Sequence, residues 1–152
     1  MHRNAIVLGI ASLLVCLSGG CQTHYAHDEF TGTWRGTGHT INSRGKQLTK
    51  KFIIIQIDEN GLVEGHSGWE LVEGSGGHDG DTPTITDSEE VIGVFDPEDG
   101  ELNLVETREH GILRGTVLDR DRIKMVLVQS GEKPVASTFV LTRVPPSTDS
   151  GK

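Results

Sequence analysis

The sequence predicts an all-β domain of about eight antiparallel strands, closed into an up-and-down barrel, with no substantial helix. Three observations predict this fold. Clusters of turn-forming residues recur along the chain, roughly every 11 or 12 residues from Asp96 onward. Between the clusters, apolar and polar residues alternate with a period of two, which is typical of a sheet that covers a core on one side. Glycine, at 20 of 152 residues, is spread along the chain, as expected for many turns and bulges.

The turn clusters set the bounds of the strands. They lie at residues 58–61, 96–100, 109–111, 119–121 and 130–133. The segments around them predict strands at 30–41, 48–57, 61–72, 85–95, 101–107, 111–118, 122–129 and 136–144. Successive antiparallel strands leave two unpaired edges, and closing the sheet into a barrel removes both edges.

The alternation also assigns residues to the two faces of the sheet. Lys124, Arg114 and Glu106 are expected to point outward, which excludes a barrel embedded in lipid. The positions expected inside are of two kinds: small residues (Gly65, Ser67, Gly93, Gly115) and large residues (Phe52, Trp69, Phe95, Met125, Phe139). Small residues would leave room for one ligand and large residues would fill the interior. The sequence therefore leaves open whether the barrel is hollow.

The first twenty residues have the three parts of an export signal. Arg3 supplies the positive charge, residues 5–17 are apolar, and Ser18, Gly19 and Gly20 are small. With Cys21 directly after them, these residues resemble a bacterial lipoprotein signal, although Leu17 lies one residue further from the cysteine than is usual. The alternative is an ordinary signal peptide that is cleaved near Gly20.

Counting cysteines favours the lipoprotein interpretation. Cys16 would leave with the signal, so Cys21 would be the only cysteine of the mature chain, and an acyl anchor on its sulfur would explain it. The resemblance then implies a membrane partner through the lipid, and Gln22 implies sorting to an outer membrane. The expected organisation is a signal peptide at 1–20, a tether at 21–29, the barrel at 30–144 and a disordered tail at 145–152.

The charge limits the classes of partner. The chain has 14 basic and 22 acidic residues, for a net charge of −8. Because phosphate binding needs basic patches, this balance argues against nucleic acid. It also argues against docking on anionic lipid by charge alone.

The stretch "FTGTWRGTG" contains Gly32, Thr33 and Trp34 at the start of the first predicted strand, and Arg143 lies near the end of the last. These residues are similar to the signature of the calycin group, which includes the lipocalins, avidins and fatty-acid-binding proteins. The resemblance implies that Trp34 closes the floor of the barrel and that Arg143 packs across its ring, with a cation–π contact as the physical reason. We expect Trp34 to be mostly buried. The resemblance also implies a ligand in the mouth of the barrel.

Catalytic and metal sites are weakly supported. Neighbouring residues on a strand point to opposite faces, so His66 cannot activate Ser67, and no Gly-x-Ser-x-Gly elbow is present. His24, His27 and Asp28 lie in the expected tether, where nothing rigid would fix a metal geometry. His78, Asp79 and Asp81 lie in an acidic loop at 73–84 that lacks the spacing of an EF-hand. We expect no metal, no cofactor and no catalytic residue.

The loop at 73–84 is longer than a hairpin needs, and long loops on a rigid barrel often carry recognition. We therefore interpret His78, Asp79 and Asp81 as a candidate binding loop, beside a second loop at 41–47; a loose insertion is the alternative. Three functions follow, in order of support. The first is a non-enzymatic envelope lipoprotein that binds a small apolar or amphipathic ligand. The second is a protein-binding module with a solid barrel, such as an inhibitor or an accessory subunit. The third is an enzyme.

Overall fold

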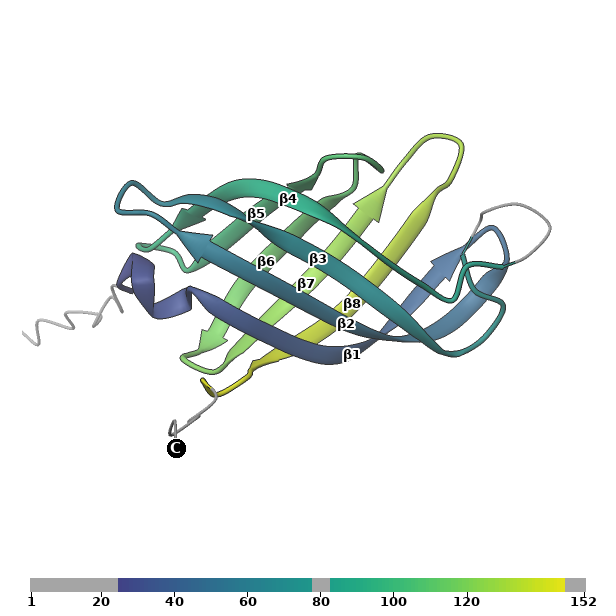
Figure 1. The fold of residues 1–152 in the computed structure, drawn as a ribbon, viewed down its shortest axis with the longest axis horizontal. Helices are drawn as coiled ribbons and strands as arrows, with labels where there is room; N and C mark the ends of the chain where they lie inside the picture. The colour runs from purple at the N-terminus through teal and green to yellow at the C-terminus, as the bar shows by residue number, and fades with distance from the viewer. Residues whose placement is uncertain (1–24, 78–82, 147–152) are drawn as a thin grey trace, which may run out of the picture.

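A computed structural model of the chain describes residues 25–77 and 83–146. It contains one short 3-10 helix, η1 (His27–Phe30), followed by eight strands: β1 (Gly32–Asn42), β2 (Gly45–Ile57), β3 (Leu62–Glu73), β4 (Thr86–Asp96), β5 (Glu101–Glu106), β6 (Ile112–Asp119), β7 (Arg122–Gln129) and β8 (Val135–Arg143). All neighbours are antiparallel, and β1 also pairs with β8, so the sheet closes in sequence order (Figure 1). The predicted all-β barrel of eight strands is confirmed. Within the described residues, no helix is both long and apolar enough to cross a bilayer.

The predicted turns all lie between strands, and only one strand begins far from its expected position. β2 starts at Gly45 rather than residue 48. Gly45 has a positive φ of 111° and pairs with Asn42, so the connection shrinks to Ser43 and Arg44. A glycine adopts this conformation at little cost, which lets both strands run further than the polar sequence suggested.

The floor of the barrel is closed by an aromatic cluster beneath the first strand. Phe30 and Trp34 are completely buried, and their rings are stacked with centroids 6.0 Å apart. The guanidinium carbon of Arg143 lies 4.3 Å from the centre of the Trp34 ring. The same guanidinium donates hydrogen bonds to the carbonyls of Thr31, at 3.1 Å, and Glu29. This is the arrangement that the calycin resemblance implies, and the predicted burial of Trp34 is confirmed.

Part of the segment that we assigned to the tether packs against this floor. The Tyr25 ring meets Phe30 edge-on at 5.3 Å, and the Tyr25 backbone N–H donates to the carbonyl of Pro97 at 3.1 Å. His27 lies edge-on to Phe95 at 6.3 Å. The chain therefore enters the barrel at its closed end (Figure 1).

Large side chains fill the half of the barrel above this floor. Met125 is fully buried, and Phe95 and Phe139 are 4% exposed. We expected Gly115 to leave room inside, but a methyl group on its Cα would lie 2.5 Å from the Met125 sulfur. That expectation was wrong, because the sulfur already occupies the space. This half of the interior is a packed core.

Two residues lie on the face opposite to the one predicted. Phe52 is outside, where it pairs with Gly68 and its ring covers that glycine. Glu106 is inside and only 7% exposed. Both follow the alternation of their own strands, since Phe52 neighbours the buried Ile53 and Glu106 is in phase with the buried Leu104. Arg114 and Lys124 are exposed, as predicted.

Candidate functional site

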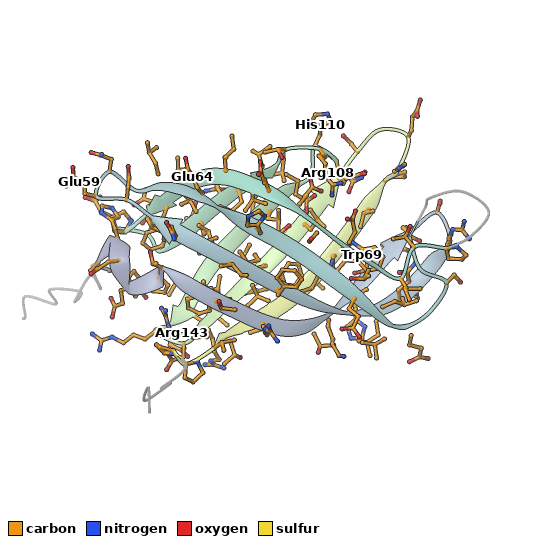
Figure 2. All side chains as sticks on the ribbon, viewed as in Figure 1. Glu59, Glu64, Trp69, Arg108, His110 and Arg143 are labelled. Carbon is orange, nitrogen blue, oxygen red and sulfur yellow. The ribbon has the colours of Figure 1, made fainter. Side chains whose placement is uncertain are left out.

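A cavity of about 90 Å³ occupies the end of the barrel away from η1. Figure 2 shows Trp69, which lines it, towards one end of the barrel and Arg143 at the other. The walls are of three kinds: polar (Thr40, Gln47, Thr49, Ser67), charged (Lys51, Asp87, Glu89, Glu106, Glu109, Lys133) and apolar (Ile53, Trp69, Leu113, Leu127, Phe139). The barrel is therefore solid at its floor and hollow at its mouth.

Three buried hydroxyl groups form one polar wall beside the cavity. Thr40 Oγ1 lies 2.7 Å from Ser137 Oγ and 3.1 Å from Thr49 Oγ1, which joins β8, β1 and β2. Ser137 and Thr49 each donate to a carbonyl of β1, at His39 and Gly38. Among the described residues, no buried side-chain nitrogen or oxygen lacks a hydrogen-bond partner. This wall is rigid because its members hold one another.

Glu106 is the most unusual acid of the site. Its carboxylate accepts a hydrogen bond from Ser67 Oγ at 3.2 Å. Burial raises the pKa of the Glu106 carboxyl to about 7, and the nearby charge of Glu89 raises it further, while the Ser67 bond and Lys51 act against the rise. A methyl group on Gly111 would lie 2.0 Å from the second oxygen of Glu106, so this carboxyl fits only beside a glycine. At neutral pH the group can therefore either donate or accept a hydrogen bond.

Lys51 supplies a positive charge to the same cavity. Its side chain is 7% exposed, and its Nζ lies 5.6 Å from the centre of the Phe139 ring. Burial lowers the pKa of the Lys51 ammonium to about 8, although the charge of Glu106 offsets part of this effect. Buried groups with displaced pKa values inside a concave site are candidates for a binding or reaction site.

The acids at the rim of the mouth have partners of their own. Asp87 pairs with the Arg108 guanidinium at 3.2 Å. Glu89 accepts the backbone N–H groups of Arg108, at 2.8 Å, and Glu109, at 3.1 Å. The Glu109 carboxylate accepts from Gln129 at 3.1 Å and lies 3.9 Å from the Lys133 ammonium. These contacts join β4 to the β5–β6 and β7–β8 connections around the opening.

The two loops that we expected to share a rim do meet. The carbonyl of Gly76 accepts hydrogen bonds from the side-chain amides of Asn42, at 3.0 Å, and Gln47. The backbone N–H of Gly77 donates to Thr84 at 2.7 Å, which closes the neck of the 73–84 loop. The predicted contact between the loops is confirmed.

Other residues from the sequence analysis are placed as follows. His78, Asp79 and Asp81 of the candidate binding loop, and Cys21 of the expected anchor, lie outside the described residues. Ser67 points inward and His66 outward, as predicted, so the pair does not form a nucleophile and base. Across residues 25–77 and 83–146, no group of three or more His, Cys, Asp or Glu side chains could hold a metal ion.

Sequence reasoning missed Lys51 and Glu106 as members of the site. The signal was present in the alternation: Lys51 is in phase with Ile53, and Glu106 is in phase with Leu104. A charged residue that continues an inward apolar series lies either in a strained core or near an opening. Following the phase rather than the polarity would have identified both residues.

Comparisons with known proteins bear on the fold. No protein-family model matches the chain, and no curated protein matches its sequence. Among solved structures, mFAP2b bound to DFHBI aligns with a TM-score of 0.54 and 13% identity, over 80% of this chain and 99% of that one. A redesigned β-barrel, mFAP1, bound to DFHBI, aligns with a TM-score of 0.50 and 16% identity, over 78% and 98%.

Bovine odorant-binding protein, in complex with a selenium-containing odorant, aligns with a TM-score of 0.46 and 12% identity, over 81% of this chain and 75% of that one. At such identities the likeness concerns the fold. With eight antiparallel strands closed in sequence order over a tryptophan and an arginine, the chain has the fold of a calycin-like barrel.

Proposed function

We propose that the protein is a non-enzymatic binding protein that holds a small amphipathic molecule in the open half of its barrel. The observation that carries this proposal is the division of the interior. The floor is closed by Phe30, Trp34 and Arg143, whereas the mouth contains a cavity with both polar and apolar walls. Binding sites for small molecules are typically concave and largely apolar, with a few polar groups that fix orientation. The structures bound to DFHBI support the proposal, since their barrels resemble this one and carry a small molecule.

The proposal includes export and a lipid anchor on Cys21, with the outer membrane as the destination. Its support is the charged, apolar and small-residue pattern of residues 1–20 and the single cysteine that would remain after cleavage. Growth with a tagged fatty acid should label the wild-type protein and leave Cys21→Ser unlabelled. Equal labelling of both proteins would contradict the anchor and leave ligand binding unaffected.

The anchor would also orient the barrel. Tyr25 contacts the closed floor, and only four residues of chain separate it from Cys21. A chain extends at most about 3.6 Å per residue, so the floor would stay within about 14 Å of the anchored cysteine. The mouth would then face away from the membrane. A ligand would enter from the aqueous side, which favours a small soluble molecule over a lipid taken from the bilayer.

Native mass spectrometry tests the binding proposal. The protein is purified gently from its own host, and its native mass is compared with the mass after denaturation. An added mass of the order of one to a few hundred daltons that is lost on denaturation would support a carrier. A bare polypeptide mass in preparations from every growth condition would contradict it.

A second candidate function, binding to another protein, is favoured by the outer face of the sheet. Ile92, Val105, Ile112 and Val128 are directly paired across β4 to β7, and each is between 45% and 55% exposed. A continuous apolar row on a water-facing surface is typical of an interaction site. A photo-crosslinker in place of Val105 should then capture one envelope protein, and the same crosslinker in place of Lys124 should not.

A further inference from the structure

Lys51 is a buried cation that faces the cavity without a partner. Its side chain is 7% exposed, and its ammonium lies against the Phe139 ring. Among the described residues, no carboxylate lies within the 4.0 Å of an ion pair from it, and no group accepts a hydrogen bond from it. Since Lys51 lines the cavity, its ammonium is available to a molecule bound there.

The neighbouring lysine shows what an ordinary position looks like. Lys50 is on the outer face of β2, is 60% exposed and pairs with Glu70 at 3.2 Å. The two lysines are adjacent in sequence and differ in environment alone. A buried charge without a counterion is costly, so a position such as that of Lys51 is expected where a bound group supplies the opposite charge.

The charges around the cavity favour an anion of low charge. Asp87 is offset by Arg108, and Glu109 is offset by Lys133. Glu89 already accepts two backbone N–H groups, and Glu106 accepts from Ser67. Lys51 is therefore the unsatisfied charge among the described walls. A dianion would meet repulsion from Glu89 and Glu106, whereas a monoanion needs only one partner.

The size of the cavity limits the rest of the molecule. At about 90 Å³, it is smaller than the 300–1,000 Å³ of a typical drug-sized pocket. A long acyl chain does not fit, because the core below the cavity is filled by Met125 and its neighbours. Leu113, Leu127 and Phe139 form an apolar wall beside Lys51 that suits one ring or a short chain.

We propose that the ligand is a compact organic monoanion of the carboxylate class, with its acid group on the Lys51 ammonium and its apolar body against Phe139 and Leu127. This inference rests on the proposed function, because it specifies the molecule that the barrel holds. The carboxylate completes the missing ion pair, and charge-assisted hydrogen bonds of this kind are the stronger ones in proteins. A neutral molecule of the same shape would leave the ammonium unpaired.

Three probes of matched size and different charge test the inference: benzoate, benzyl alcohol and benzylamine. Their affinities are measured by isothermal titration calorimetry on the protein as its host produces it. We expect benzoate to bind at least about tenfold more tightly than benzyl alcohol, and benzylamine to bind more weakly than both. In Lys51→Met, benzoate should fall to the affinity of benzyl alcohol. Lys50→Met is the matched control and should bind all three probes as the wild type does.

The outcomes separate this inference from the proposed function. If benzyl alcohol or benzylamine binds as tightly as benzoate, or if Lys51→Met keeps the preference for benzoate, the inference is overturned while the binding function stands. If the folded wild-type protein binds none of the three probes, the inference is overturned and the cavity loses its role as a small-molecule site. Circular dichroism establishes folding of Lys51→Met, which replaces a buried charge by an apolar side chain of similar length.

Discussion

The buried carboxyl of Glu106 should make the stability of the barrel depend on pH, and Glu106→Gln should remove that dependence. The pKa of the carboxyl rises from 4.5 to about 7 on folding, because burial and the charge of Glu89 disfavour the ionised form. The folded protein therefore binds the proton more tightly than the unfolded chain. Under linkage, the free energy of unfolding then falls as the pH rises from 4.5 to 7 and levels off above 7.

The size of the effect follows from the same pKa values. Each tenfold change in proton affinity corresponds to about 1.4 kcal/mol, so a pKa raised from 4.5 to about 7 corresponds to at most about 3 kcal/mol. Glutamine keeps the shape of the side chain and an acceptor for Ser67, and it cannot ionise. We expect Glu106→Gln to match the wild type at pH 4 and to exceed its stability by about 2 to 3 kcal/mol at pH 8.

Urea unfolding of both proteins at pH values from 4 to 8 measures this difference. Glu70→Gln is a suitable control, because the Glu70 carboxylate is on the outer face and is 60% exposed; it should leave the pH profile nearly unchanged. Parallel profiles for the wild type and Glu106→Gln would refute the reasoning, since they would mean that the carboxyl is as well solvated in the barrel as in the unfolded chain.

Three further predictions concern the charged cavity, the floor and the outer face. Because burial lowers the pKa of Lys51 from 10.5 to about 8, the wild type should gain up to about 3 kcal/mol of stability between pH 8 and 10.5 in urea unfolding, and Lys51→Met should gain none of it. Trp34→Ala empties a completely buried site and should lower the free energy of unfolding by about 3 to 5 kcal/mol. Gly68→Ala places a methyl group 2.3 Å from the Phe52 ring and should cost about 1 to 3 kcal/mol, most of which Phe52→Leu should restore. Equal thermal stability of Gly68→Ala and the wild type would mean that the ring moves aside freely.

Much of the fold could be predicted because an antiparallel barrel is a repetition of local rules. Each turn cluster ends one strand and starts the next, and alternation fixes the inward face without reference to distant residues. The phase of Leu113, Met125 and Phe139 was therefore readable, and all three are buried. Closure followed from the need to pair the two edges, and the structure joins β1 to β8 along nine residue pairs.

The errors came from judging residues by their type rather than by their phase. Glu106 was placed outside because it is charged, and Phe52 inside because it is aromatic. In the structure, Glu106 lies at the mouth, where Ser67 and the cavity can accommodate it, and Phe52 covers the bare backbone of Gly68 on the outer face. An aromatic ring over a cross-strand glycine shields backbone that would otherwise face water, so its outward position has a physical reason.

The position of the site also follows from the inward residues, once they are taken in order from floor to mouth. On β2 the inward series is apolar at Ile57, Ile55 and Ile53 and then changes to Lys51, Thr49 and Gln47. On β5 it changes from Leu102 and Leu104 to Glu106, and on β8 from Leu141 and Phe139 to Ser137. The change occurs at the same level of the barrel on strands that run in opposite directions along the chain. Buried polar side chains are retained where they can be satisfied, and a shared level of change on several strands means that they are satisfied by one another and by a bound molecule rather than by chance. The level at which polarity changes on the inward face thus marks the boundary between the core that stabilises the barrel and the cavity that can bind a ligand.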